Sequence, residues 1–379
     1  MFSNLATITR ENASQLQVVG TLEGHTAPVL SIATTLGGQL LASGSMDGTA
    51  RVWNLDTQEQ VNVFAANPEN EQISRVAFSP ANPDHLATAI GRKPSWAMSD
   101  VRDYVGNLAQ DMFSHSRGKP VWRLWSLEEE TVVHTEAAQY ALLGTAGLAY
   151  SRNQQWLAAM DGVWDITTVP YARAARLTEY HVRDMAFSAD SERLALVAFY
   201  EQMPESIMHH MVEIYHTATW QPVAEISETW RITGFSDVCF LPNTHDLLVR
   251  TSVESLRAHG AHRLYRYGGD RFEESTRILS DVACFAPHPD GSIVAIARYD
   301  GHMVLLDADR HRPLATVRAY QPAQPVNMPR GFLIGGTDVV NAAARSQYRA
   351  AQDMVFSPDG RLLISADGDQ VLRIWGIPT

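Results

Sequence analysis

The chain has 379 residues, 45% of them hydrophobic and 19% charged, so it can build a packed core and is not an intrinsically disordered protein. Its formal net charge of −12 argues against a protein that binds nucleic acids mainly through their phosphates. Its 2 cysteines, Cys239 and Cys284, exclude a disulfide framework and a four-thiolate zinc site. The sequence shows neither an apolar run of about 20 residues nor a secretory signal. We therefore expect a cytoplasmic protein that binds no membrane.

Turn-forming clusters followed by short apolar strands recur along the chain. Gly, Pro, Asn, Asp and Ser precede alternating or continuous apolar residues, which is typical of a turn that leads into a β-strand. These strands begin at Leu40, His85, Trp156, Leu194, Leu247, Ile293 and Leu362. Each is preceded by another apolar strand, as VLSIATT precedes the first. The regular recurrence predicts a repeat architecture rather than a mixed α/β domain.

A third strand in each unit carries an aromatic or large apolar residue. In chain order these residues are Trp53, Trp125, Trp164, Tyr215, Tyr265, Leu306 and Trp375. A fourth strand follows in most units, as in EQVNVFA after Trp53. Four strands joined by short turns predict a small antiparallel sheet for each unit.

The unit resembles the WD repeat. The first unit matches best, with Gly24-His25, the turn Met46-Asp47-Gly48-Thr49, and Trp53-Asn54 where the family usually has Trp-Asp. Residues 347–377 align to it without a gap, which places Asp369 and Trp375 on Asp47 and Trp53, and Gln347 on His25. The resemblance implies an all-β fold, a seven-bladed β-propeller of four-stranded antiparallel blades in which residues 1–379 form one domain.

The resemblance also implies a structural hydrogen-bond set within a blade. Its members would be His25, Ser43, Asp47 and Trp53 in the first unit, and Ser365, Asp369 and Trp375 in the last. A His, Ser and Asp together also suggest a hydrolase. We favour the structural role, because a catalytic nucleophile needs its base within hydrogen-bond reach in an open cleft. We expect no catalytic residue, metal or cofactor.

The two ends of the chain predict how the ring closes. Only four residues follow Trp375, too few for a fourth strand, whereas QLQVVGTL near the N-terminus belongs to no unit. Pairing residues 15–22 with the last three strands would complete that blade and remove an open sheet edge.

Extra residues are concentrated in a few connections. They fall at 91–120, 199–210 and 251–262, each between a second and a third strand, and at 320–346 between two units. Strands in an antiparallel sheet alternate in direction, so all four connections belong to one end of the propeller.

The connection at 91–120 combines a helical stripe with basic and aromatic residues. In SDVRDYVGNLAQDM the apolar residues recur at helical spacing behind Ser99 or Asp100, which predicts an amphipathic helix. Its stripe either packs on the propeller or binds a partner, whose candidate contacts are Arg92, Lys93, Trp96, Arg102, Tyr104, Phe113, Arg117 and Lys119. These basic residues suit an acidic protein surface or RNA.

Three other motifs are weak candidates for chemistry. We expect His209, His210, His259 and His262 to be solvated, because they lack a metal-binding spacing. Cys239 and Cys284 fall beside phenylalanines in two first strands, which predicts equivalent, buried and unreactive thiols. GFLIGGTD lacks the lysine of a phosphate-binding loop.

These observations favour a non-catalytic protein–protein interaction scaffold, a monomeric subunit or recruitment module of a larger complex that binds one or more proteins through the face with the insertions. One alternative is an RNA- or peptide-sensing module that controls an effector on another chain. Another is an enzyme with its site at the mouth of the propeller channel.

Overall fold

The computed structural model describes residues 2–66, 69, 71–92, 121–137, 147–160, 162–168, 171–178, 180–202, 207–229, 233–242, 244, 246–253, 261–267, 272–280, 282–319 and 351–379. Within these ranges the regular structure is β-strand apart from two short 3₁₀ helices, η1 (Phe2–Asn4) and η2 (Ala13–Gln15). None of the described helices is long and apolar enough to cross a membrane. The helix expected near residues 99–112 lies outside the described residues.

Six antiparallel sheets contain four strands each. Blade one comprises β3 (Val29–Thr34), β4 (Leu40–Ser45), β5 (Thr49–Asn54) and β6 (Glu59–Ala65), and blade two comprises β7 (Glu71–Phe78), β8 (His85–Arg92), β9 (Val121–Ser126) and β10 (Val132–Ala137). Blade three comprises β11 (Leu148–Tyr150), β12 (Trp156–Ala159), β13 (Gly162–Asp165) and β14 (Ala172–Arg176), and blade four comprises β15 (His181–Phe187), β16 (Arg193–Gln202), β17 (Ile207–His216) and β18 (Gln221–Thr229). Blade five comprises β19 (Thr233–Phe240), β20 (Asp246–Val253), β21 (Ala261–Tyr267) and β22 (Phe272–Ser280), and blade six comprises β23 (Val282–Pro287), β24 (Ile293–Arg298), β25 (His302–Asp307) and β26 (Arg312–Arg318).

The seventh sheet, which we call the closing sheet, joins the two ends of the chain. It contains β27 (Ala351–Phe356), β28 (Leu363–Asp367), β29 (Leu372–Pro378), β1 (Leu5–Ala6) and β2 (Gln17–Leu22). Both N-terminal strands pair antiparallel with β29, β2 along Leu372–Gly376 and β1 at its last two residues. The strand expected within residues 15–22 therefore lies beside the C-terminal strand, as predicted.

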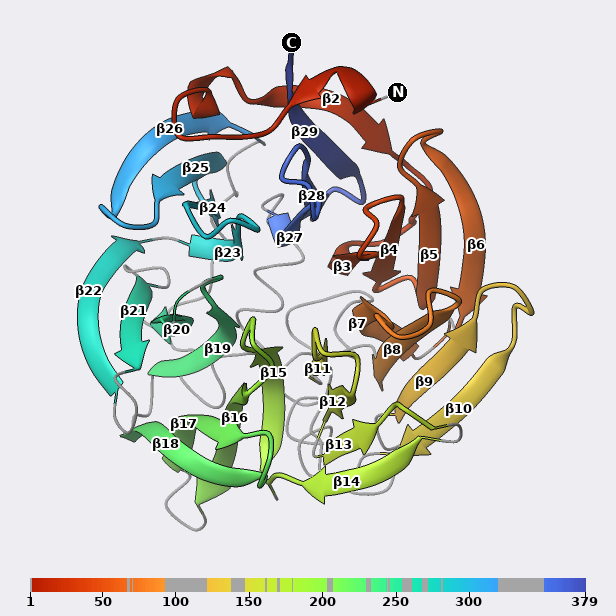
Figure 1. The fold of residues 1–379 in the computed structure, drawn as a ribbon, viewed down its shortest axis with the longest axis vertical. Coiled ribbons are helices and arrows are strands. Elements are labelled where there is room, and N and C mark those ends of the chain that lie inside the picture. Colours follow the sequence, from red (N-terminus) through yellow and green to blue (C-terminus); the bar gives the residue numbers. More distant parts are fainter. Residues whose placement is uncertain are drawn as a thin grey trace, which may run out of the picture.

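The sheets form a ring, with the first strand of each blade nearest the axis and the fourth at the rim (Figure 1). The fold is thus an all-β propeller of four-stranded antiparallel blades, in which β27 and β3 lie side by side where the ring closes. Neighbouring blades pack through apolar side chains, as where Ala42 and Val52 of blade one meet Ile73 and Val76 of blade two. Gly44 lies at this seam, since a Cβ there would come within 2.7 Å of Ile73 Cγ2.

The N-terminal residues also cover the seam between blade six and the closing sheet. Ile8, Ala13 and Leu16 are buried in a cluster that includes Ile293 and Leu305 of blade six. The backbone N–H of Ile8 donates to the carbonyl of Gly360 at 2.9 Å. The segment before β2 thus adds a second, apolar attachment to the strand pairing.

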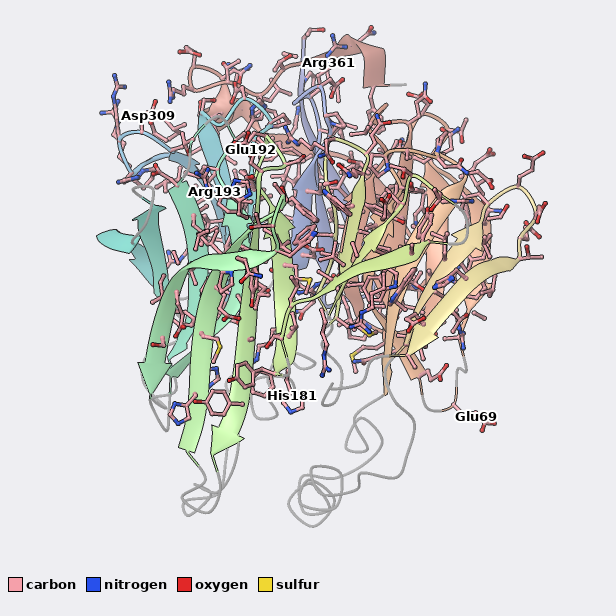
Figure 2. All side chains as sticks on the ribbon, turned by 60° about the horizontal axis from the view of Figure 1, so that its bottom comes forward. Glu69, His181, Glu192, Arg193, Asp309 and Arg361 are labelled. Atoms are coloured by element: carbon pink, nitrogen blue, oxygen red, sulfur yellow. The ribbon has the colours of Figure 1, made fainter. Side chains whose placement is uncertain are left out.

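The two ends of the propeller carry different connections (Figure 2). Glu192 and Arg361, from turns between first and second strands, and Arg193, which begins β16, lie at one end together with Asp309, and we call it the turn face. Glu69, which precedes β7, and His181, which begins β15, lie at the other end, which we call the loop face. The strands that flank residues 93–120 end at the loop face, as the alternating strand direction requires.

Strands extend into two segments that were expected to be inserted loops. In blade four the pairing of β16 with β17 continues through Phe199↔His210 to Gln202↔Ile207. In blade five, β20 runs to Val253 and β21 begins at Ala261. The expected loop at 199–210 was therefore wrong except for its tip, because aromatic and imidazole side chains favour an extended hairpin.

Candidate functional site

Blade one holds His25, Ser43, Asp47 and Trp53 in one hydrogen-bonded chain. Trp53 Nε1 donates to Ser43 Oγ at 2.8 Å, and Ser43 Oγ lies 2.8 Å from His25 Nε2. His25 Nδ1 lies 2.8 Å from Asp47 Oδ2 and donates to it, because an ionised carboxylate can only accept. In the neutral imidazole Nε2 then accepts the Ser43 hydroxyl proton. The side chains come from β4, β5 and the two connections at the loop face.

Further donors hold the Asp47 carboxylate. Thr49 Oγ1 donates to Oδ1 at 2.6 Å, and the Thr26 N–H donates to Oδ2 at 3.1 Å. Burial by itself raises the pKa of Asp47, but the hydrogen bonds that its carboxylate accepts from His25, Thr49 and Thr26 outweigh burial and hold the pKa well below its ordinary value. Asp47 therefore remains ionised and orients the ring of His25.

The Ser–His–Asp order in blade one matches the connectivity of a catalytic triad, but its serine is inaccessible. Ser43 is 0% exposed and His25 is 5% exposed. The Ser43 oxygen also accepts the indole N–H of Trp53, so a substrate carbonyl has no approach to it. The arrangement instead satisfies buried polar groups that would otherwise be costly.

The bond from tryptophan to a hydroxyl recurs in two other sheets. Trp125 Nε1 donates to Thr88 Oγ1 at 3.0 Å, and Trp375 Nε1 donates to Ser365 Oγ at 3.1 Å. Each hydroxyl lies three residues after the strand start expected from the sequence, at Leu40, His85 and Leu362, and the same position in the other blades is Ala159, Val197, Arg250 and Ile296. Blades three, four and six therefore have an apolar residue at this position, and blade five has an arginine.

Asp369 does not join the set in which we expected it. Its carboxylate pairs with Arg373, whose Nη2 donates to Oδ2 at 2.8 Å, and Arg373 also pairs with Asp367. Ser365 and Trp375 therefore form their bond without an aspartate from the turn. Asp367 is 0% exposed and needs a positive partner, which Arg373 provides. Once placed there, Arg373 also pairs with the carboxylate of Asp369.

A second recurring position lies on the innermost strands, four residues before the residue that opens the turn to the second strand. Its occupants are Ser31, Arg75, Gly147, Asp184, Asp237, Cys284 and Asp353. In most blades it follows a break in strand register, so the side chain turns toward the next blade. Asp184 Oδ2 accepts the Val238 N–H and Asp353 Oδ2 accepts the Ile32 N–H, both at 2.9 Å. These links between blades were not predicted, although the constant spacing of their residues from the turn is a signal for them in the sequence.

Arg75 connects carboxylates from distant blades at the centre of the ring. Its Nη2 lies 3.6 Å from Asp184 Oδ1 and 3.6 Å from Asp237 Oδ1. Arg250 also pairs with Asp237, and its Nη1 donates to the Tyr299 hydroxyl at 3.5 Å. The centre of the propeller thus holds a network of ion pairs.

Burial governs the acidity of this network. It raises the pKa of Asp184 to about 7 and that of Asp353 to about 6, and in both cases the charge of Arg75 opposes the shift. Carboxyls with such pKa values resemble general acids and bases, but Asp184 accepts a backbone N–H and contacts an arginine. The network therefore serves to join blades.

The two thiols are not equivalent. Cys284 occupies the bulge position of its strand, whereas that position in blade five is Asp237, two residues before Cys239. Cys284 is buried and donates to the carbonyl of Ala351, while Cys239 is half-buried. Burial raises the pKa of both thiols well above the ordinary value, so neither is an activated thiolate.

The histidines on the blade four hairpin correct another expectation. His210 is 3% exposed rather than solvated, and burial lowers its pKa to about 3. His209 is half-buried and stacks on Tyr200. His262 belongs to β21, and His259 lies outside the described residues. No group of three or more candidate metal ligands occurs in the described parts of the chain.

The predicted partner contacts fall almost wholly outside the described residues. Arg92 ends β8 at the loop face. The other seven, Lys93, Trp96, Arg102, Tyr104, Phe113, Arg117 and Lys119, lie in the segment that the structure does not describe.

Comparisons with known proteins match the two ends of the chain most clearly. The family model "WD domain, G-beta repeat" matches residues 16–54 and 346–376. A stretch of 68 residues is 35% identical to a ribosome biogenesis protein BOP1 homolog of Oryza sativa subsp. japonica, covering 18% of this chain and 10% of that protein. A stretch of 94 residues is 34% identical to a periodic tryptophan protein 2 homolog of Neurospora crassa, covering 24% of this chain and 10% of that protein.

A third relative is THO complex subunit 3 of Arabidopsis thaliana, 33% identical over 73 residues, which cover 19% of this chain and 23% of the relative. The chain thus matches less than a quarter of the length of each of these relatives. The matched repeats include both tryptophan–serine pairs and lie in a ring of four-stranded antiparallel blades. The two ends of the chain therefore match the WD repeat, and the sheets of the chain form a β-propeller like those that this repeat builds.

Proposed function

We propose that this chain is a non-catalytic interaction scaffold, a subunit or recruitment module of a larger protein complex that docks partners on its loop face. In this proposal the closing sheet counts as the seventh blade, with β2 as its outer strand. The observation that carries the proposal is the contrast between the two faces of the ring.

The turn face is made of short turns that satisfy their own polar groups. Ser151 Oγ donates to Asn153 Oδ1 and Ser357 Oγ donates to Asp359 Oδ1, both at 2.6 Å. His288 Nδ1 lies 2.7 Å from Asp290 Oδ1 in the corresponding turn of blade six. Such turns leave few unsatisfied groups for a partner.

The loop face differs in length and chemistry. The hairpin of β16 and β17 extends there, and the residues that follow Arg92 belong to its longest second-to-third-strand connection. Long connections in a compact domain tend to be functional. We propose residues 91–120 as the main docking segment, with Trp96, Tyr104 and Phe113 as apolar anchors and the five basic residues as contacts for an acidic partner surface.

Catalysis receives no support from the described residues. Ser43 and His25 are buried, and the central carboxylates are engaged by arginines and backbone N–H groups. Two relatives carry names that refer to ribosome biogenesis and to a THO complex. A role in an assembly is consistent with those names.

The test replaces residues 93–119 by a four-residue turn and compares co-purification of partners from source cells with that of the intact chain. Because residues 93–119 join the adjacent strands β8 and β9, which a short turn can also join, we expect unchanged melting and loss of at least one partner. A control in which Arg193 and Arg361 on the turn face become serine should keep every partner. Retention of all partners by the shortened chain would place the interface elsewhere and contradict the proposal.

A further inference from the structure

The end of blade four at the loop face carries two parallel rows of rings, one on each side of the sheet. In the first row, Tyr180 stacks on Tyr200 with centroids 4.6 Å apart, and Tyr200 stacks on His209 at 4.6 Å with an interplanar angle of 6°. In the second row, Phe199 lies between His181 and His210, at 5.3 and 5.9 Å. The cross-strand pairs Phe199↔His210 and Tyr200↔His209 are consecutive, so pleating sends the rows to opposite sides.

The second row already binds a guanidinium group of the same chain. The Cζ atom of Arg183 lies 4.3 Å from the centroid of the Phe199 ring, and its Nη1 donates to the Phe235 carbonyl of blade five at 3.3 Å. This row therefore faces blade five and is buried with its cation. The contact of Arg183 with Phe199 is therefore an intramolecular example of a guanidinium group bound by a row of rings at this end of blade four.

The first row faces blade three, whose strands are much shorter. β12 and β13 have four residues each, whereas β16 and β17 have ten each. From their aligned starts at Trp156 and Leu194, β16 extends beyond the last residue of β12 and carries Tyr200 past it. Tyr180 is 37% exposed at the end of the stack. The Tyr180 end of the row is thus partly exposed at the loop face.

Two carboxylates lie on the same side of the sheet as this row. Glu213 and Glu225 are direct cross-strand partners, an arrangement that is destabilising for like charges unless a cation is near. The Tyr215 hydroxyl lies 3.2 Å from Glu213 Oε2 and 3.0 Å from the carbonyl of Leu177, three residues before Tyr180. Burial, and then the charge of Glu225, raises the pKa of Glu213.

The whole blade shares this negative charge. Residues 180–229 contain eight carboxylates but only two basic residues, Arg183 and Arg193. In the described parts of the chain, neither Glu213 nor Glu225 forms an ion pair with an arginine, lysine or histidine. A cationic ligand would therefore find both an aromatic surface and compensating charge.

We propose that the row Tyr180–Tyr200–His209, with Glu213 and Glu225, is a docking site for an arginine-bearing segment of a partner protein. In this proposal a guanidinium group packs against the partly exposed side chain of Tyr180 as Arg183 does against Phe199, and the segment's positive charge is balanced by the two carboxylates. Charge complementarity selects this occupant over RNA, whose bases would stack but whose phosphates would be repelled. The proposal rests on the scaffold function and adds the chemistry of one partner.

The test measures fluorescence anisotropy of labelled hexa-arginine, hexalysine and oligouridine probes with the full-length protein. We expect hexa-arginine to bind more tightly than hexalysine, because only guanidinium groups stack well on rings. The Tyr180→Ala change should weaken hexa-arginine binding about 2- to 30-fold, the range that cation–π contacts provide. Tyr180→Phe should keep the affinity within about 2-fold, since it retains the ring face.

The Glu225→Gln change provides a second variant with little risk to folding, because Glu225 is exposed. It should weaken hexa-arginine binding, whereas Glu192→Gln on the turn face, which removes one charge from the same blade, should not. Equal affinity for the lysine and arginine probes, or an affinity that Tyr180→Ala does not change, would mean that the probes bind only through the negative charge of the protein. Either result would overturn the proposal. Competition by oligouridine would assign the stack to nucleobases and also overturn it. Since this test uses short probes and no natural partner, its failure would leave the partner co-purification test of the scaffold function unaffected.

Discussion

Blade one and the closing sheet align without a gap, yet they satisfy their buried polar groups in different ways. In both, a tryptophan of the third strand donates to a serine of the second, Trp53 to Ser43 and Trp375 to Ser365. In blade one, His25 extends this bond to Asp47. In the closing sheet Arg373 takes up the carboxylates instead.

One substitution explains much of the difference. Position 45 of blade one is a serine, whose hydroxyl donates to the carbonyls of Ala27 and Pro28, and the corresponding residue of the closing sheet is Asp367. A buried carboxylate requires a cation, and Arg373 supplies it, whereas the equivalent Arg51 is directed to Gln60. The comparison shows that the tryptophan–serine bond is the common element. The aspartate of the turn accepts from His25 in blade one and from Arg373 in the closing sheet.

Deleting residues 1–24 should have the largest effect, because it removes two strands of the closing sheet and opens the seam between that sheet and blade six. It removes β1, β2 and the buried Ile8, Ala13 and Leu16, and it leaves β29 as an open edge. We expect aggregation or a fall in Tm larger than any point substitution causes, measured by thermal unfolding and light scattering. The Val18→Ala change, at an exposed site on β2, should have little effect. A truncated chain that melts like the full one would show that the pairing contributes little.

Replacing the tryptophans tests the common element. Trp53→Ala and Trp375→Ala should each cost about 3 to 5 kcal/mol in the free energy of unfolding, because each deletes a large buried side chain. The Trp53 change should be the more costly, since it also removes a donor from the hydrogen-bonded set that links Ser43, His25 and Asp47. Urea unfolding measures both. Wild-type stability with lost partner binding would mean that Trp53 belongs to an interface.

Substituting Arg373 and Arg51 in turn tests whether the arginine has a different role in the closing sheet and in blade one. Arg373→Met leaves Asp367 buried without a counter-charge and should cost about 3 kcal/mol at pH 8. Arg51→Met at the equivalent position should cost under about 1 kcal/mol, because among the described residues Arg51 donates to the neutral amide of Gln60 rather than to a carboxylate. Equal losses in the two variants would indicate that Arg373 acts through packing alone.

The two aspartates should give opposite responses to pH, the smallest effect of the four. The pKa of Asp47 is lowered in the folded state, so its contribution to stability is present above about pH 4 and is lost as the pH falls further. Burial raises the pKa of Asp367 to about 7, so folding becomes less favourable as the pH rises from about 4 to 7.

Relative to wild type, Asp47→Asn should therefore lose stability chiefly at neutral pH, whereas Asp367→Asn should improve as the pH rises toward 8. Urea midpoints at pH 4, 6 and 8 measure the trend, with Asp56→Asn at an exposed turn as the control. A parallel pH response of the two variants would show that both aspartates sit in the same electrostatic environment.

Patterns within one repeat were readable from the sequence because their causes are local. Turn residues followed by alternating apolar residues predicted the strands, and the lack of a fourth strand after Trp375 predicted the pairing of Gln17–Leu22 with β29. The same local alignment placed Ser43 beside Trp53. It failed at Asp369, because the alignment records residue type but not the competing arginine two strand positions from Trp375.

The lengths of strands β16 and β17 were not predicted correctly from the sequence. Residues 199–210 were expected as an insertion because the distance between repeats was long, yet most of them continue β16 and β17. Distance along a chain cannot distinguish a longer loop from longer strands. The alternation of Phe199, Tyr200, His209 and His210 between two faces of a sheet was the signal that decides it.

By itself, therefore, the sequence determined the repeated strand pattern, the tryptophan–hydroxyl pairs and the closing strand, since each depends on residues within one repeat or on an unmatched strand at a chain end. Only the tertiary structure decided which residues meet at the centre and at the blade edges. Arg75 contacts Asp184 and Asp237 from blades far apart in sequence, and Tyr180 lies accessible beside a shorter neighbouring blade. Such contacts depend on how the ring brings distant strands together, which short-range spacing does not encode.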